Sequence, residues 1–317
     1  MTRKLRVFEA FSGIGSQRKA LFNIGVPHEV VAISEIDKYA IKSYIAIHGE
    51  VNNLGDITKI DVNDIPEHDL FTYSFPCQDI SSAGKRCGFT KGSNTRSSLL
   101  WECQRIIEHC KPKYLLMENV KNLVSKRFKC DFDMWLEYLE SLGYTNYYKV
   151  LNAKDFGIPQ NRERVFVVSV LGGCEFEFIT PNIHSNLSNF VSNDIYEQID
   201  SRIMKSCIHP FTMEYENIII SDKDIYQCKV TSGYQDKKVG IKVSPTLRAN
   251  KTHTCVLIDG KIKKLTSKDM WMLSGFDELD YQKAKSVVSD AQLMKQAGNT
   301  IVVQVLESIF KQLFIKQ

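Results

Sequence analysis

The sequence predicts an α/β protein built on a mostly parallel sheet with helices on both faces, joined to a smaller, mainly β domain. Short apolar runs of strand length alternate with helical stretches as far as Val170, and this alternation is typical of a parallel sheet covered on both faces. The amino-acid composition changes after about Gly172. Residues 182–195 are rich in Asn and Ser, as in a linker or loop cluster. Acidic residues then prevail at 194–224 and basic residues at 229–251, where we expect the second domain.

The strands of the first domain are expected where aliphatic, β-branched and aromatic residues run together. Such runs cover residues 5–11, 30–34, 69–75, 114–117 and 165–170. Helical stretches lie between them, at 100–110 and 132–142. The first run ends in a glycine turn, and ligands of open α/β sheets bind at the carboxyl ends of strands.

Three segments are expected along the chain, namely 1–178, 179–284 and 285–317. The first holds the sheet, the second is the smaller domain, and the third returns to the first. We expect this return because apolar residues of the tail lie on one face of a helix, which must pack on another element. These residues are Ile301, Val305, Ile309 and Leu313.

The composition is that of an ordinary globular protein, since 43% of the 317 residues are apolar and 25% are charged. These values exclude a disordered tail, a collagen-like fibre and a disulfide-dense small scaffold. The 41 basic and 37 acidic residues give a net charge of +4, too small by itself to indicate a nucleic-acid partner. Nine cysteines without a Cys-x-x-Cys pair favour reduced thiols, so we expect no metal site and no disulfide framework.

The apolar segments are short, and none is long enough to cross a bilayer as a helix. The N-terminus is basic like a secretion signal, but Glu9, Gly13 and Gly15 interrupt the apolar stretch behind it. We therefore expect a cytoplasmic protein with no membrane partner.

A glycine turn at Gly13 and Gly15 follows the first expected strand. Glu35 lies 20 positions after Gly15, a spacing that suits a carboxylate accepting hydrogen bonds from ribose hydroxyls, and Asp56 follows further on. Arg18 stands where dinucleotide-binding proteins have a third glycine, which favours a nucleoside without a pyrophosphate. The same residues also fit an ordinary tight turn with solvated acids, and this alternative stays open.

Cys77 comes directly after an apolar run and is preceded by Pro76, which stiffens the backbone before it. The segment 81–96 contains four basic residues, three glycines and no acid. A cysteine at a strand end beside such a segment suggests a nucleophile covered by an arm that closes over a polyanion. A buried, inert thiol is the alternative, and we favour it for Cys103, Cys110 and Cys228.

Glu118 ends another expected strand, so it should face the same crevice as Cys77. Arg162 and Arg164 are two positions apart, so in an extended chain they share one face. An exposed, salt-bridged turn explains the two arginines equally well when they are taken alone.

Taken together, the motifs resemble those of the DNA (cytosine-5)-methyltransferases of the compact bacterial or phage type. The ordered series is Phe-x-Gly-x-Gly, an acid, Gly-Asp-Ile, Pro-Cys-Gln, Glu-Asn-Val, Gln-x-Arg-x-Arg and Gly-Asn-Thr. The resemblance runs from about Leu5 to Val305 and is weakest over 175–230, where the family holds its target-recognition domain. It implies a Rossmann-like methyltransferase fold, with that domain at 179–284.

The resemblance also implies the chemistry of the site. Cys77 is expected to add as a thiolate to carbon 6 of cytosine, and Glu118 to hydrogen-bond ring nitrogen 3. Arg164 is expected to hold the carbonyl oxygen, and Arg162 the adjoining phosphate or Glu118.

The implied cofactor is S-adenosyl-L-methionine, with Glu35 at its ribose. Phe11 is expected to stack near it, beside the turn at Gly13 and Gly15. Ile36 stands where relatives often carry an aromatic, so weaker adenine stacking is expected. Further expected contacts are Asp56 and Ile57 at the adenine, with Pro76, Leu99 and Asn299 lining the rest of the pocket.

Double-stranded DNA is the implied substrate, and the target base must be flipped out to react. Gln235 is the expected filler of the gap and Ser82 its partner, although an ordinary glycine turn also explains Gln235. Thr246 resembles a residue that grips a phosphate. Other expected DNA contacts are Gln78, Lys85, Arg86 and Arg248.

The expected setting is a bacterial or phage-infected cell, with the protein at the nucleoid. We expect a monomer, working beside a cognate restriction endonuclease or as an orphan enzyme. Three alternatives stay open: a cytosine-5 methyltransferase of transfer RNA, an inactive DNA-binding relative, and a nicotinamide oxidoreductase. The last shares the sheet but leaves Cys77, Glu118 and the paired arginines unexplained.

Overall fold

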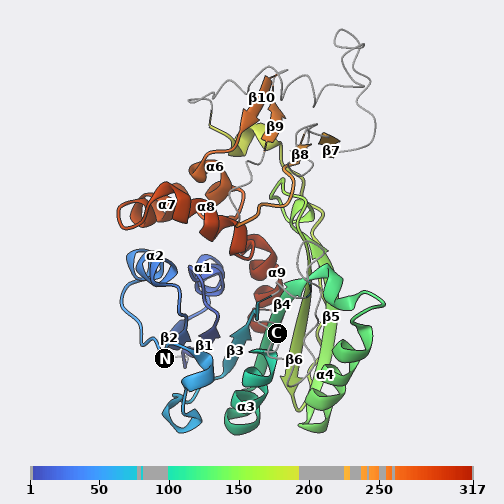
Figure 1. Cartoon of the computed structure of the whole chain (residues 1–317). Coiled ribbons are helices and arrows are strands. Elements are labelled where there is room, and N and C mark those ends of the chain that lie inside the picture. The colour runs from blue at the N-terminus through green and yellow to red at the C-terminus, as the bar shows by residue number, and fades with distance from the viewer. Residues whose placement is uncertain are drawn as a thin grey trace. The chain divides into compact units, whose positions relative to one another are not determined.

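The computed structural model describes residues 3–76, 80, 99–192, 225–228, 237–240, 243–249, 255–258 and 261–315. The chain forms two compact units (Figure 1). The first contains Met1–Leu151, Glu163–Thr180 and Val303–Gln317, and the second contains Asn152–Arg162 and Pro181–Val302. These units differ from the expected segments in two places, because residues 152–162 and 285–302 belong to the second unit.

The first unit is built on a six-stranded sheet in the order β2-β1-β3-β4-β6-β5. Its strands are β1 (Leu5–Ala10), β2 (His28–Ser34), β3 (Leu70–Tyr73), β4 (Tyr114–Val120), β5 (Tyr144–Asn152) and β6 (Glu163–Leu171). Strands β2, β1, β3 and β4 run parallel to one another, whereas β6 pairs antiparallel with β4. The sequence analysis missed β5, an edge strand whose side chains are mostly exposed or half-buried and so lack an apolar run.

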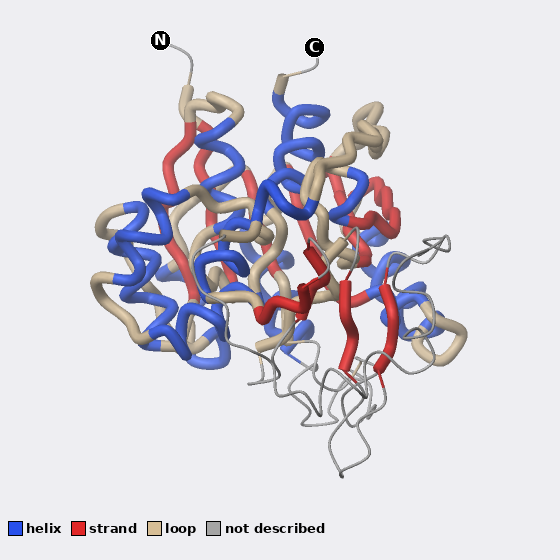
Figure 2. Tube along the Cα trace, turned by 90° about the horizontal axis from the view of Figure 1, so that it is seen from above, coloured by secondary structure: helices blue, strands red, loops and turns tan. Residues whose placement is uncertain are grey.

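Helices cover both faces of this sheet, as expected (Figure 2). They are α1 (Ser16–Asn23), α2 (Lys38–His48), α3 (Leu100–Cys110), α4 (Lys129–Ser141) and α9 (Val303–Phe314). Apolar side chains of α3 and α4 form one buried cluster with alternate residues of the strands, such as Phe8, Phe71 and Met117. Because side chains alternate across a strand, Val7, Glu9 and their neighbours in register point to the opposite face.

Helix α9 packs against α1 within the first unit. Its buried face includes Val305, Ile309 and Leu313, and the helix begins at Val303, just after the buried Ile301. Ser308 Oγ also donates to the Ile179 carbonyl at 2.9 Å, at the end of the segment that follows β6. Apolar burial and a polar contact thus both attach the tail to the sheet unit.

The second unit contains a four-stranded sheet in the order β10-β9-β8-β7. Its strands are β7 (Ile225–Cys228), β8 (Lys237–Gly240), β9 (Cys255–Ile258) and β10 (Lys261–Lys264). Three helices belong to the same unit: α6 (Ser267–Met272), α7 (Glu278–Lys285) and α8 (Asp290–Asn299). Thr266 and Asp269 form a reciprocal capping box at the start of α6, which satisfies two backbone N–H groups there.

Among the residues that the structure describes, no helix has the length and apolar character needed to span a membrane.

Candidate active site

Glu118 and Arg164 form an ion pair at one edge of the first sheet. Arg164 lies opposite Val120 in the antiparallel ladder, so it shares a face with Glu118, which is two residues from Val120. Arg164 Nε lies 3.1 Å from Glu118 Oε1, and the two side chains are only 15% and 10% exposed. Arg164 Nη1 also donates to the Glu163 carbonyl at 2.8 Å. The two sequence-predicted residues are therefore brought together, with the guanidinium held from two sides.

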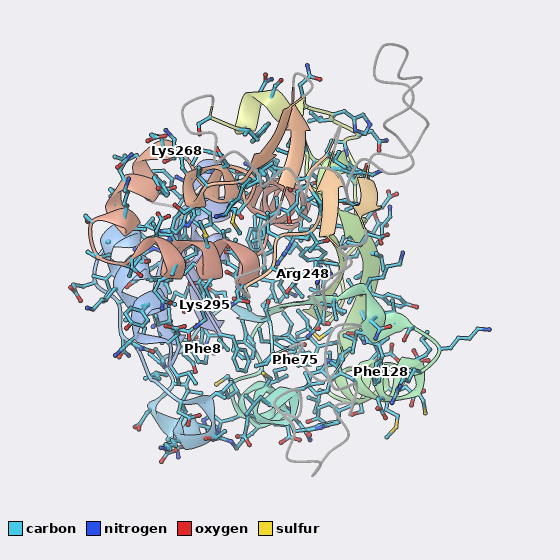
Figure 3. All side chains as sticks on the ribbon, turned by 45° about the horizontal axis from the view of Figure 1, so that its top comes forward. Phe8, Phe75, Phe128, Arg248, Lys268 and Lys295 are labelled. Carbon is cyan, nitrogen blue, oxygen red and sulfur yellow. The ribbon has the colours of Figure 1, made fainter. Side chains whose placement is uncertain are left out.

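Two asparagines that follow Glu118 in the sequence hold backbone carbonyls on either side of position 77. Asn119 Nδ2 donates to the Phe75 carbonyl at 3.0 Å, and Asn122 Nδ2 donates to the Ile80 carbonyl at 2.5 Å. Phe75, labelled in Figure 3, and Ile80 are both buried. The amides thus fix the approach to Cys77 and the exit from it relative to the strand that carries Glu118. Sequence reasoning missed Asn122, although a polar side chain just after a strand that ends in a functional residue is a usable signal.

The glycine turn after β1 has the backbone of a ligand-binding loop. Gly13 has φ +56° and Gly15 φ +80°, values that favour glycine, and Phe11 adopts φ +54° although it carries a bulky side chain. The Gly13 N–H donates to Glu35 Oε2 at 2.9 Å. Glu35 Oε1 accepts hydrogen bonds from the N–H groups of Ile36 and Asp37, both at 2.8 Å. The Glu35 carboxylate is therefore oriented by three backbone donors, and its position ties β2 to the turn.

The residues expected around an adenine differ in exposure. The Ile36 side chain is 74% exposed and provides an apolar surface. Asp56 is half-buried, and hydrogen bonds from the Thr58 backbone N–H and hydroxyl hold its pKa below the usual range. Ile57 is different, because its side chain is buried in the core and its carbonyl accepts from Arg105 Nη2 at 3.0 Å. Only the Ile57 backbone N–H, and not its side chain, suits the expected adenine contact.

These groups suit S-adenosylmethionine. The turn offers close backbone approach, Glu35 offers carboxylate oxygens for ribose hydroxyls, and Asp56 offers an acceptor for an amino group. Pro76 and Leu99 are half-buried in the same unit, Leu99 immediately before α3. Asn299 is exposed at the end of α8, in the second unit.

Arg162 holds backbone of the second unit together. Its guanidinium donates to the carbonyls of Leu247, Gly298 and Thr300 at 3.3, 3.2 and 2.7 Å. The residue is 4% exposed, and all four residues belong to the second unit. A buried guanidinium that satisfies three carbonyls braces the backbone. Its expected contact with a phosphate or with Glu118 stays a prediction.

Gln160 works alongside Arg162 within the second unit. Gln160 Nε2 donates to the Leu273 carbonyl at 2.7 Å, and its Oε1 accepts from the Leu247 N–H at 3.3 Å. Thr246 Oγ1 donates to the Asn161 carbonyl at 2.5 Å. Three consecutive residues, 160–162, thus hold the segment 246–247 in place.

Gly298 completes this packing. A Cβ on Gly298 would lie 2.3 Å from the backbone at Arg248 and Ala249, so no larger residue fits there. The close approach explains the glycine of the Gly-Asn-Thr motif. The Arg248 side chain itself is exposed (Figure 3).

Several predicted residues lie outside the described ranges: Cys77, Gln78, Ser82, Lys85, Arg86 and Gln235. Of the other cysteines, Cys103 is buried, as expected, and burial raises the pKa of its thiol well above the usual value. Cys110 is half-buried, and the side chain of Cys228 is not described. Within the described residues no group of three or more His, Cys, Asp or Glu is placed to hold a metal ion.

The sheet, the glycine turn and the acid after β2 define the class of S-adenosylmethionine-dependent methyltransferases. The solved structures of S. pombe Dnmt2 methyltransferase and of Entamoeba histolytica methyltransferase EhMeth align over 99% and 100% of this chain and of theirs. Their TM-scores are 0.72 and 0.76, each at 18% identity, so this likeness shows the fold.

The chain belongs to the C-5 cytosine-specific DNA methylase family, whose sequence profile matches residues 5–315. Type II methyltransferase M2.ScrFI of Lactococcus lactis subsp. cremoris is 40% identical over 99% of this chain and 100% of that protein. Orphan methyltransferase M.SssI of Spiroplasma monobiae is 32% identical over 97% of each chain. The expected fold, enzyme class, cofactor and DNA substrate are thereby confirmed.

Proposed function

We propose that this protein methylates carbon 5 of a cytosine flipped out of duplex DNA, through a covalent adduct between Cys77 and carbon 6. The Glu118–Arg164 ion pair supports this best, because Asn119, beside Glu118 in β4, and Asn122, just after β4, hold the carbonyls of Phe75 and Ile80 on either side of position 77. A carboxyl group and a guanidinium side by side match a ring nitrogen and a carbonyl oxygen on one edge of cytosine.

The chemistry needs a nucleophile because carbon 5 of cytosine is too electron-poor to attack a methyl donor. Addition of the Cys77 thiolate to carbon 6 forms an S–C bond and moves an electron pair to carbon 5, which then takes the methyl group. Loss of the carbon-5 proton to a base restores the double bond and expels the thiolate. S-adenosylmethionine supplies the methyl group when bound.

The residues of the first unit prepare this reaction before any ligand binds. Glu118, protonated or sharing a proton, hydrogen-bonds ring nitrogen 3 and Arg164 holds the carbonyl oxygen, and the contact between the two side chains places both groups in advance. Asn119 and Asn122 fix the chain around the nucleophile. For the cofactor, Glu35 takes the ribose and Asp56 the adenine amino group, while Phe11, Ile36, Pro76 and Leu99 line the pocket. Asn299, in the second unit, is a further predicted cofactor contact.

We assign recognition of the duplex to residues 179–284. Thr246 is held by the Asn161 carbonyl, and the exposed Arg248 follows two residues later, which suits contacts with backbone phosphates. Gln235 fills the place of the flipped base with Ser82 as its partner. The remaining proposed DNA contacts are Gln78, Lys85 and Arg86.

Similarity to enzymes named type II and orphan methyltransferases suggests a place in a restriction-modification system or a solitary role. A cognate restriction endonuclease is then a functional partner and not a physical one. The enzyme acts as a monomer at the nucleoid, because a short duplex site can be met one strand at a time.

Bisulfite sequencing of DNA from a methylation-free host that expresses this chain tests the activity and the specificity together. Protected cytosines in one recurring sequence, absent with Cys77→Ala, are the expected result. Folded protein that binds S-adenosylmethionine but protects no DNA would overturn the proposal. Transfer of labelled methyl groups to RNA would then identify an RNA enzyme, and no transfer an inactive DNA-binding relative.

The covalent step has its own test. Duplex DNA carrying 5-fluorocytosine at the target should trap the adduct, because fluorine cannot leave carbon 5 as a proton does. We expect a stable protein–DNA band with the active enzyme and none with Cys77→Ser. An active enzyme that traps nothing would disprove the addition–elimination mechanism.

A further inference from the structure

A buried acid lies behind the cofactor turn. Glu9, in β1, is fully buried on the face of the sheet opposite the α3–α4 cluster. The Tyr44 hydroxyl, from α2, donates to Glu9 Oε2 at 2.7 Å. Burying a carboxylate is costly, so a chain that keeps one four residues before Gly13 needs a reason for it.

The partner of Glu9 touches the turn itself. A Cβ on Gly15 would lie 2.7 Å from Tyr44 Cε2 and 2.6 Å from His48 Nε2, so both rings press directly against this glycine. His48 Nε2 also lies 3.1 Å from the Ile14 carbonyl, where a protonated nitrogen donates a hydrogen bond. The rings of Tyr44 and His48 are 4.8 Å apart. Glu9, Tyr44 and His48 therefore form one continuous support, which we call the buttress, beneath Ile14 and Gly15.

Among the described residues, few titratable or charged groups surround Glu9. From α2 the titratable groups are Tyr44 and, next to it, His48; from α1 it is Arg18, whose Cζ lies 5.8 Å from the Tyr44 ring centroid. The neighbours of Glu9 in register, Ile33 in β2 and Thr72 in β3, carry no charge.

Burial dominates the protonation of Glu9. Burial raises its pKa to about 7, against the lowering effects of the Tyr44 hydrogen bond and the Arg18 charge. The acid therefore changes its charge near neutral pH. An ionised carboxylate accepts a stronger hydrogen bond from the Tyr44 hydroxyl than a protonated one does.

We propose that Glu9 is a proton-linked positioning residue, whose ionised form holds Tyr44 and His48 so that the Ile14–Gly15 turn receives S-adenosylmethionine. The inference rests on the proposed assignment of this turn to the cofactor. It extends that assignment, because the buttress touches the turn from behind and needs no contact with the ligand. Binding then favours ionised Glu9, so a proton is released and affinity rises as the pH rises through 7.

Calorimetric binding of S-adenosylmethionine and S-adenosylhomocysteine to the full chain, between pH 6 and 8, tests this without catalysis. We expect affinity to rise about fivefold over this range, because a one-unit fall of the Glu9 pKa on binding gives about tenfold only between the fully protonated and fully ionised limits. Titrations in buffers of different ionisation enthalpy should reveal the released proton. Because the effect passes through the turn, the sulfonium and the uncharged thioether should show the same pH dependence.

Variants separate the buttress from other titrating groups. Glu9→Gln keeps a hydrogen-bond acceptor but cannot ionise, so its affinity for S-adenosylmethionine should no longer rise with pH. Tyr44→Phe should lose this pH dependence as well. Glu29→Gln, at an exposed carboxylate on β2, is the matched control and should retain it. A wild-type affinity that does not change with pH, or a rise that survives in Glu9→Gln, would overturn the proposal.

The choice of ligand adds a further criterion. A rise seen with S-adenosylmethionine alone would also count against the buttress, since it would mean direct attraction of the cation. Cys77 takes no part in these measurements, so failure of the covalent mechanism and failure of the buttress give different results.

Discussion

Two arginines only two positions apart, Arg162 and Arg164, belong to different units and do different work. Arg164 ends the antiparallel ladder of the first unit and pairs with Glu118. Arg162 is buried in the second unit and donates to three backbone carbonyls. An arginine side chain can thus take part in the reaction where it pairs with a functional side chain, and can stabilise the fold where it donates to backbone carbonyls. The difference lies in the partners and not in the sequence motif.

The largest expected effect separates the two arginines by activity. Arg164→Met and Glu118→Gln should each lower methyl transfer about a hundredfold to ten-thousandfold, because each removes a group that grips the reacting base. Initial rates of labelled methyl transfer to duplex DNA measure this. A circular dichroism spectrum like that of the wild type shows that each variant is folded, and a variant that keeps its rate would remove its residue from the catalytic set.

The second effect is on the free energy of unfolding and tests whether Arg162 braces the backbone. Arg162→Met should lower the free energy of unfolding by about 3 kcal/mol, since three buried carbonyls lose a charged donor. Arg248→Met, at an exposed arginine of the same unit, is the matched control and should cost less than about 1 kcal/mol. Urea denaturation followed by circular dichroism gives both values. Equal losses in the two variants would abolish the distinction.

Glu9 extends the comparison to pH. Its folded pKa of about 7 lies above the ordinary glutamate pKa of 4.5, so between these pH values the folded state holds a proton that the unfolded state has lost. The contribution of Glu9 to stability is therefore full below pH 4.5 and is lost as the pH rises to about 7, a change of about 3 kcal/mol. Glu9→Gln should lack this component in urea titrations of the ligand-free chain. If the free energies of unfolding of the wild type and of Glu9→Gln differ by the same amount at every pH, this prediction is contradicted.

The smallest expected effect concerns the exposed surface beside the cofactor turn. Ile36→Trp should tighten S-adenosylmethionine binding by about threefold to tenfold, because an indole stacks on adenine better than an aliphatic chain does. Equilibrium binding of the ligand to the whole chain measures this, with Ile183→Trp, at an exposed position of the second unit, as control. Equal gains at both positions would indicate nonspecific apolar binding.

Much of the fold was readable because strand and helix periodicity are local properties. The buried runs that became β1, β3 and β4 stood out by their apolar residues, and α3 was expected with the bounds that it has. Strand β5 escaped because an edge strand with exposed and half-buried side chains has no such run. The antiparallel pairing of β6 with β4 was not predicted either, since strand direction depends on where the chain re-enters the sheet.

The candidate site divides in the same way. Glu118 was expected at the crevice from its place at a strand end, whereas the place of Arg164 beside the reacting base came only from the resemblance, since their pairing depends on β6 running antiparallel to β4. Asn122 and the Glu9–Tyr44–His48 buttress were not expected, since their partners lie between 34 and 42 positions away in the chain. The bracing of backbone by Arg162 was not expected, because its partners there are backbone carbonyls, which no side-chain pattern reveals.

The sequence by itself determined the class of fold, the family and the order of the functional motifs, because these depend on residue types and spacing. Only the tertiary structure decided which groups meet: that Arg164 pairs with Glu118, that Arg162 braces backbone, and that a buried acid supports the cofactor turn. The physical reason is that hydrogen bonds and burial join residues distant in the chain. A side chain's function follows from the environment that folding builds around it.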